Sequence, residues 1–187
     1  IKNSNQELRG KLTAKNLDLM AEQVAVGALK YSLLKYARET TIQFDINESL
    51  SLEGDSGPYL QYTYARCQSV IEKWEAGSEK REARSGKWDT TNLASRISHL
   101  ASEELTLLRT LYRFPEIVQT AAETYSPNLI CTYLFDLAQK YNNLYNKHRI
   151  LGSDKELESF RLALTSATGQ ILKNGLTLLG IETPERM

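Results

Sequence analysis

The sequence predicts an all-α protein built as a helical bundle, and three observations lead to that prediction. Long stretches are rich in Leu, Ala, Glu, Lys, Gln and Arg, residues that favour helices. Within these stretches apolar residues recur at intervals of three and four, the spacing of one helix face. Capping and stop residues separate one stretch from the next. About six to eight helices with short connections are therefore expected.

The N-terminal part is expected to contain two helices and a short third one. Residues 4–7, Ser-Asn-Gln-Glu, have the form of a capping box and predict a short helix to Lys15. A longer helix is predicted over 16–37. Residues 45–48, Asp-Ile-Asn-Glu, form another possible cap for a short helix near Leu50. The buried face of the longer helix is predicted to carry Leu17, Met20, Val24, Ala28, Tyr31 and Leu34.

The next predicted helix runs from Pro58 to about Ala76. Gly57 can cap this helix, and Pro58 suits the first helical position, where its missing N–H is no loss. The polar segment 77–87 has no apolar periodicity. It is expected to be a mobile, solvated loop, although its basic residues could also touch a nucleic acid.

Four signals divide the second half of the chain. Helical patterning resumes near Thr91 and continues to Leu111. The run 114–116, Phe-Pro-Glu, is expected to start a short helix, and Ser126-Pro127 to start a long one to about Arg149. The last helix is predicted over 155–173, with Asn174-Gly175 as its stop.

The composition allows a buried core and offers little for catalysis. A chain of 187 residues, 41% of them hydrophobic, forms one large or two small domains. Cys67 and Cys131 show neither zinc spacing nor a disulfide framework, so both are expected to be reduced and buried. His99 and His148 lack the acidic neighbour of a di-iron bundle, and no metal site is expected. The leucines assigned to the core are Leu137, Leu144, Leu162, Leu164, Leu172, Leu176 and Leu179.

The most informative run is Glu53–Arg66, which opens a helix with closely spaced tyrosines. Tyr59 and Tyr62 are three residues apart and share one helix face, and Arg66 lies one turn beyond Tyr62. Aromatic rings beside a guanidinium group can stack unpaired bases and hold phosphates. The alternative is structural: the tyrosines pack against a core, and Arg66 forms a salt bridge.

Three runs of this chain resemble arginyl-tRNA synthetases. The run EGDSGPYLQYTYARCQSV is similar to the opening of that family's anticodon-binding domain, which reads Glu-Gly-(Asn/Asp)-(Thr/Ser)-(Ala/Gly)-Pro-Tyr-Leu-Gln-Tyr and then Arg. The run RLALTSATGQILKNGLTLLGIETPERM resembles the family's C-terminal helix and closing segment. A third run, YLFDLAQKYNNLYNK, lies between them. Together they cover most of residues 20–187.

The resemblance implies a division of the chain and a longer parent protein. Residues 1–52 would be connecting helices that follow a catalytic core, and residues 53–187 a helical anticodon-binding domain. The first residue is Ile1 rather than methionine, which suggests a segment of a longer chain. The ATP-binding motifs of the family would lie upstream of it.

The resemblance also implies a set of RNA-binding residues. Tyr59 and Tyr62 match tyrosines that meet the anticodon loop, and Arg66 follows them. Tyr145 matches a further aromatic contact near the end of the penultimate helix. Arg149 stands where some members carry tryptophan, and an arginine can still stack or grip a phosphate. Met187 matches a terminal methionine that lies against the anticodon loop in some members.

Several of these residues have a structural alternative. Tyr145 continues a heptad-like run of core positions, and Met187 could be a frayed terminus. Lysines in the connecting helices could contact phosphates or simply be solvated: Lys11, Lys15, Lys30 and Lys35.

The function implied by the resemblance is anticodon binding in a full-length enzyme that joins arginine to its tRNA with ATP and Mg. This chain itself is expected to hold no catalytic residue and no cofactor. Its expected partners are arginine tRNA and the catalytic domain of the same protein, with no membrane contact. We expect a cytoplasmic monomer. The alternatives are a helical protein-interaction module without an RNA role and, with no supporting motif, a self-contained helical enzyme.

The charge balance limits how this chain could bind RNA. Its 23 basic and 23 acidic residues give a net charge of zero, whereas free-standing nucleic-acid binders usually carry a basic excess. Either a local basic patch, together with base stacking, provides the RNA contact, or the rest of the RNA-binding surface lies outside this chain. The second possibility fits a segment of a larger enzyme better.

Overall fold

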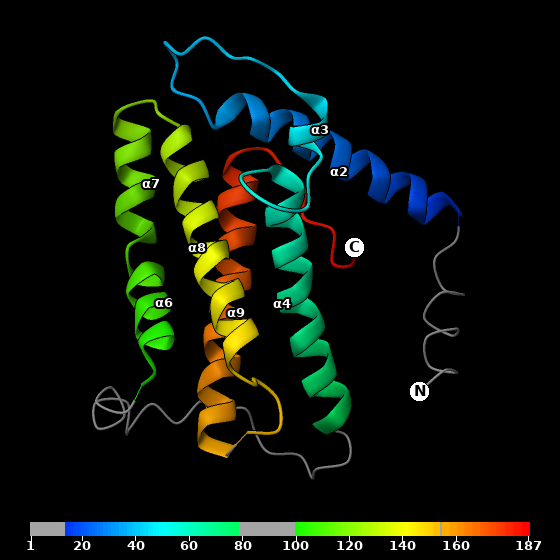
Figure 1. The fold of residues 1–187 in the computed structure, drawn as a ribbon, viewed down its shortest axis with the longest axis vertical. Helices are drawn as coiled ribbons and strands as arrows, with labels where there is room; N and C mark the ends of the chain where they lie inside the picture. The colour runs from blue at the N-terminus through cyan, green and yellow to red at the C-terminus, as the bar shows by residue number, and fades with distance from the viewer. Residues whose placement is uncertain (1–13, 79–99, 154) are drawn as a thin grey trace.

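The computed structural model of the protein describes residues 14–78, 100–153 and 155–187. All regular structure in these residues is helical, which confirms the predicted all-α class (Figure 1). The predicted helix starting near residue 4 lies outside them, apart from its last two residues, which belong to the first described helix. The helices of the described part are α2 (Ala14–Leu34), α3 (Ile46–Ser49), α4 (Gly57–Ser78), α6 (Ser102–Tyr112), α7 (Phe114–Glu123), α8 (Asn128–Lys147) and α9 (Lys155–Leu178).

The long helices α4, α8 and α9 form the centre of the bundle. Helix α4 packs mainly on α9, and α8 packs on α9 and on the consecutive helices α6 and α7. Helix α2 crosses one end of the bundle and extends beyond it (Figure 1). All seven leucines assigned to the core are buried, as predicted, and so are the free cysteines Cys67 and Cys131. Burial raises the pKa of both thiols to about 12.

Helix α2 is held against the bundle by a close backbone crossing and a buried tyrosine. A Cβ atom at Gly57 would lie 2.6 Å from the carbonyl oxygen of Gly27, so the first turn of α4 nearly touches α2. The buried hydroxyl of Tyr31 shares its single proton between two acceptors, Asp55 Oδ1 at 2.6 Å and the carbonyl oxygen of Cys131 at 3.2 Å. Burial, with the neighbouring Asp55 carboxylate, raises the pKa of Tyr31 above its usual range.

The predicted burial of Leu17 is wrong: its side chain is 46% exposed. The periodicity of α2 is real, but the first part of the helix projects past the bundle (Figure 1). The other predicted positions are at least partly covered, and Ala28 and Tyr31 are fully buried.

The predicted stop at Asn174-Gly175 is also wrong, because α9 continues to Leu178. Gly175 serves helix packing instead: a Cβ atom there would lie 2.6 Å from the Leu134 side chain of α8. The helix ends at Gly180, whose φ of 68° lies in the left-handed region. The N–H groups of Gly180 and Ile181 donate to the carbonyl oxygens of Thr177 and Leu176 at 2.9 and 2.8 Å, a Schellman ending.

The starts of α6 and α4 differ from the prediction, and the start of α3 agrees with it. The helix expected from Thr91 to Leu111 is not continuous, because residues 100 and 101 are non-helical and α6 begins at Ser102; residues 91–99 lie outside the described part. Helix α4 is capped by Ser56 rather than Gly57, since Ser56 Oγ accepts from the N–H of Tyr59 at 3.2 Å. Asp45 caps α3 as predicted.

Replacing Gly57 with alanine tests the close crossing of α2 and α4. Its methyl group would meet backbone atoms of α2 that cannot move aside, so we expect Gly57→Ala to lower the free energy of unfolding by about 1–3 kcal/mol. Gly77 lies in the same helix with no atom within 4 Å of a Cβ position. Gly77→Ala is the matched control and should be neutral or slightly stabilising. Urea denaturation measures the free energy of unfolding of both variants. Equal values for the two would contradict the close crossing of α2 and α4.

Candidate nucleic-acid interface

Tyr62 and Arg66 of α4 and Tyr145 of α8 meet at the surface of the bundle. The guanidinium carbon of Arg66 lies 4.8 Å from the ring centroid of Tyr62 and 4.9 Å from that of Tyr145. Both tyrosines are 37% exposed, so ring surface is open to solvent. We call these three residues the Arg66 cluster. The structure therefore joins three of the six predicted RNA-binding residues, from two separate sequence motifs.

Asn142 of α8 holds the Arg66 cluster in place. Its Oδ1 accepts a hydrogen bond from Arg66 Nη1 at 2.5 Å. Its Nδ2 donates to Tyr59 Oη at 2.9 Å and to Thr63 Oγ1 at 3.1 Å. Both the oxygen and the nitrogen of the amide are therefore hydrogen-bonded. The bond from Arg66 Nη1 to this fixed oxygen orients the guanidinium group.

Sequence reasoning missed Asn142, although a signal was present. Asparagine is unfavourable inside a helix unless its side chain finds a partner, and Asn142 is the fifteenth residue of the 20-residue helix α8, well inside its ends. Its neighbour Asn143 is exposed, so only the packing of α8 against α4 distinguishes the two.

Among the residues that the structure describes, Arg66 has no carboxylate partner. Within the described residues its hydrogen-bond partners are the amide of Asn142 and the hydroxyl of Tyr62, the latter at 3.2 Å. The predicted alternative of a salt bridge is therefore absent from this part of the chain. A guanidinium group has five N–H donors, so some remain for an anion such as phosphate.

The tyrosines of the α4 motif lie in different environments. Tyr59 is partly buried, with its ring edge-on to Phe135 at a centroid distance of 5.8 Å, so less of its face is open than that of Tyr62. Tyr64 is buried in the core. Tyr145 lies at the edge of the core, although earlier members of its heptad-like run are fully buried. The predicted RNA contact of Tyr59 stays a prediction.

The contacts found for Arg149, and for the neighbour of Met187, lie outside the Arg66 cluster. Arg149 is exposed, and its Nε donates to the carbonyl oxygen of Leu151 within its own loop at 2.9 Å. Arg186, next to Met187, pairs with Glu72 at 3.1 Å. Glu72 is six residues beyond Arg66, about 9 Å along the axis of α4. Both residues remain predictions as RNA contacts.

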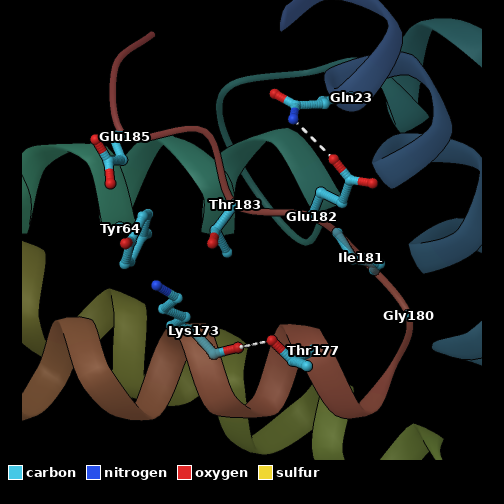
Figure 2. A pocket seen from close by; sticks show the side chains of 9 residues that line it. All are labelled: Gln23, Tyr64, Lys173, Thr177, Gly180, Ile181, Glu182, Thr183 and Glu185. Atoms are coloured by element: carbon cyan, nitrogen blue, oxygen red, sulfur yellow. Dashed lines mark hydrogen bonds between the residues drawn. The ribbon is translucent and has the colours of Figure 1, made fainter.

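The C-terminal segment Gly180–Met187, here called the tail, lies against α4 beside α2 (Figures 1 and 2). Gln61 Nε2 donates to the carbonyl oxygen of Glu182 at 2.8 Å, and Gln23 Nε2 donates to Glu182 Oε2 at 2.7 Å. A pocket of about 430 Å³ separates this part of the tail from α9. The contacts give the tail a defined course over α4.

Two of the four lysines considered as phosphate contacts bind their own chain. Lys30 Nζ donates to the carbonyl oxygen of Gly180. Lys35 pairs with Glu48 at 3.2 Å and is largely covered. The side chains of Lys11 and Lys15 lie outside the described part, as do His99 and most of the predicted loop 77–87.

The described residues meet the requirements of neither a three-ligand metal cluster nor a membrane-spanning helix. They contain no group of three or more His, Cys, Asp or Glu side chains arranged to bind a metal ion. No helix among them has the length and apolar character needed to cross a bilayer.

Comparison with known proteins identifies the family of this fold and surface. Residues 60–187 match the DALR anticodon binding domain. The chain belongs to this family. The match covers the tyrosine motif from Leu60, the whole of α8 and α9, and the tail.

Relatives of known name are arginine–tRNA ligases, and the chain corresponds to their C-terminal part. It is 38% identical to that of Thermococcus kodakarensis over 94% of this chain and 27% of the relative. It is 40% identical to that of Lactococcus lactis over 92% of this chain and 28% of the relative. The arginyl-tRNA synthetase structure from Thermus thermophilus aligns with a TM-score of 0.77 at 32% identity, over all of this chain and 31% of that one. The chain thus spans about a third or less of these proteins.

The role of Asn142 is testable by comparison with its neighbour. Asn142→Leu removes three hydrogen bonds and should lower the free energy of unfolding by about 1–3 kcal/mol. Asn143→Leu makes the same change at an exposed position and should stay within about 0.5 kcal/mol of the parent chain. Because both changes alter helix propensity equally, their difference in urea denaturation isolates the network. Equal midpoints would show that Asn142 carries no such network.

Proposed function

We propose that this chain binds the anticodon loop of an arginine tRNA as the C-terminal part of an arginine–tRNA ligase. The observation that carries the proposal is the Arg66 cluster, two open tyrosine rings with a guanidinium group between them. It lies on the part of the chain that matches the anticodon-binding family. The named relatives, at 36–40% identity over most of the chain, support the choice of arginine tRNA.

The chemistry of the cluster suits unpaired nucleotides. Tyr62 and Tyr145 each offer a flat face on which a base can stack, and each stacked base contributes about 1–3 kcal/mol. Arg66 can donate to a phosphate or extend the stack with its planar group. Asn142 keeps that group oriented before RNA arrives, which reduces the ordering cost of binding.

The catalytic step belongs to the remainder of the enzyme. There ATP, with Mg, would activate arginine, while this domain fixes the tRNA so that its acceptor end reaches the distant active site. The net charge of zero agrees with a division of the RNA footprint between this domain and the rest. The parent enzyme would act as a monomer in the cytoplasm.

Helix α2 offers a surface for the preceding part of the enzyme. Leu19, Val26 and Leu33 are exposed at intervals of seven residues and form an apolar stripe with Leu29. The stripe lies on the helix that leads toward residues 1–13, the direction in which the named relatives are longer. We infer that the catalytic domain of the same protein covers this stripe, in line with residues 1–52 being connecting helices.

Substitutions of exposed tyrosines in the full-length enzyme test the RNA role. Tyr62→Ala should weaken tRNA affinity about 5- to 150-fold, the equivalent of one lost stacking contact. Tyr112→Ala is the matched control, since Tyr112 is 88% exposed at the end of α6. Filter binding over a salt series adds a second readout: Arg66→Gln should reduce the slope of log affinity against log salt by about one, and Tyr62→Ala should leave it unchanged. If Tyr62→Ala binds tRNA as tightly as Tyr112→Ala does, Tyr62 is not in the interface.

The isolated chain should bind tRNA weakly and charge none of it. A few stacking contacts and one free guanidinium group barely offset the entropy of association. Titration of a fluorescent arginine tRNA transcript, together with an aminoacylation assay, measures both properties. Arginylation by this chain alone would contradict the proposed division of labour.

A further inference from the structure

Gln61 lies in the tyrosine motif but is not part of the Arg66 cluster. Its side chain is completely buried between α4, α2 and the tail. Nε2 donates to the carbonyl oxygen of Gln23 in α2 at 3.2 Å and to that of Glu182 in the tail at 2.8 Å. A single amide therefore connects three segments that are far apart in the sequence.

Helix α2 is shaped to receive this amide. A Cβ atom at Gly27 would lie 2.7 Å from Gln61 Nε2, so only glycine leaves the space that the amide occupies. Gly27 is buried in the helix interior, where glycine is unfavourable by about 0.5–1 kcal/mol relative to alanine. The packing of the Gln61 amide explains why glycine is found at position 27.

The other side-chain hydrogen bonds and ion pairs of the tail are more exposed. Gln23 to Glu182 and Arg186 to Glu72 are exposed side-chain pairs, and such contacts contribute little when isolated. Lys30 binds the carbonyl oxygen of Gly180 at an exposed position. The Gln61 side chain is completely buried and its bond to Glu182 is part-buried, so water competes with this bond less than with the exposed pairs.

We propose that Gln61 is a positioning residue: it fixes the tail to α2 and α4 and thereby sets the place of Met187. The role of Met187 in this statement rests on the proposed function, whereas the fixing of the tail does not. Gln61 and Tyr62 are neighbours, so one turn of α4 would serve both the stacking surface and the placement of the tail.

Hydrogen exchange of the tail in the full-length enzyme tests the positioning role. Gln61→Met keeps the length and flexibility of the side chain but removes both donors. It should speed amide exchange in the peptide covering the tail about tenfold or more, as expected when a buried anchor is lost. Gln170→Met is the control, because Gln170 is an exposed glutamine of α9 that bonds only Asn174 among the described residues. Unchanged exchange in Gln61→Met overturns the proposal.

A second variant keeps the test valid if Gln61→Met does not fold. Gly27→Ala leaves Gln61 in place but occupies the space of its amide, and should speed tail exchange in the same way. Circular dichroism confirms helix content for every variant. Fast exchange in Gly27→Ala supports the proposal, and exchange at the rate of the Gln170→Met control overturns it.

Removal of Met187 separates this proposal from the proposed function. If Gln61 places Met187, deleting Met187 should weaken tRNA binding in the parent enzyme and have no further effect in Gln61→Met. A purely structural loss would add to the deletion instead. If the deletion is harmless in the parent enzyme, the RNA contact of Met187 is wrong, and tail exchange alone decides the positioning of the tail.

Discussion

The crossing of α2 over the first turn of α4 is the contact on which the rest of the structure depends. Gly57 allows the two backbones to approach until a Cβ atom there would lie 2.6 Å from the carbonyl oxygen of Gly27, and Gly27 leaves room for the amide of Gln61. Tyr31 then reaches the loop before α4 and the first part of α8. A small area with specific polar contacts thus ties a projecting helix to the bundle, and the tail lies along the same contact.

Helix α4 serves two surfaces because successive residues of an α-helix point about 100° apart. Gln61 is completely buried toward α2 and the tail, whereas Tyr62 faces solvent beside Tyr145. On α8, Asn142 likewise has two roles, because its side chain bonds both the partly buried Tyr59 and the surface residue Arg66. The candidate RNA surface is therefore supported by the interior rather than attached to a flexible loop, which favours preorganisation.

The described residues include cations that stabilise the fold and a cation, Arg66, that is available for binding. Arg161 is buried with Glu104, at 2.7 Å, where an unpaired charge would be unfavourable. Arg66 has an amide partner and two rings instead. An amide orients a guanidinium group without neutralising it, so the positive charge persists at the surface. In a domain of zero net charge such a local cation makes RNA binding possible without a broad basic face.

The sequence by itself determined the helical class, the cap at Asp45, the helix start at Phe114-Pro115, the buried leucines and the family, because these depend on local propensity, periodicity and short motifs. Only the tertiary structure decided the structural role of individual residues. A glycine that stops a helix and one that admits Leu134 look the same in sequence, and so do an exposed Tyr62 and a buried Tyr64. What separates them is the approach of another helix, and that approach is set by packing between segments far apart in the chain.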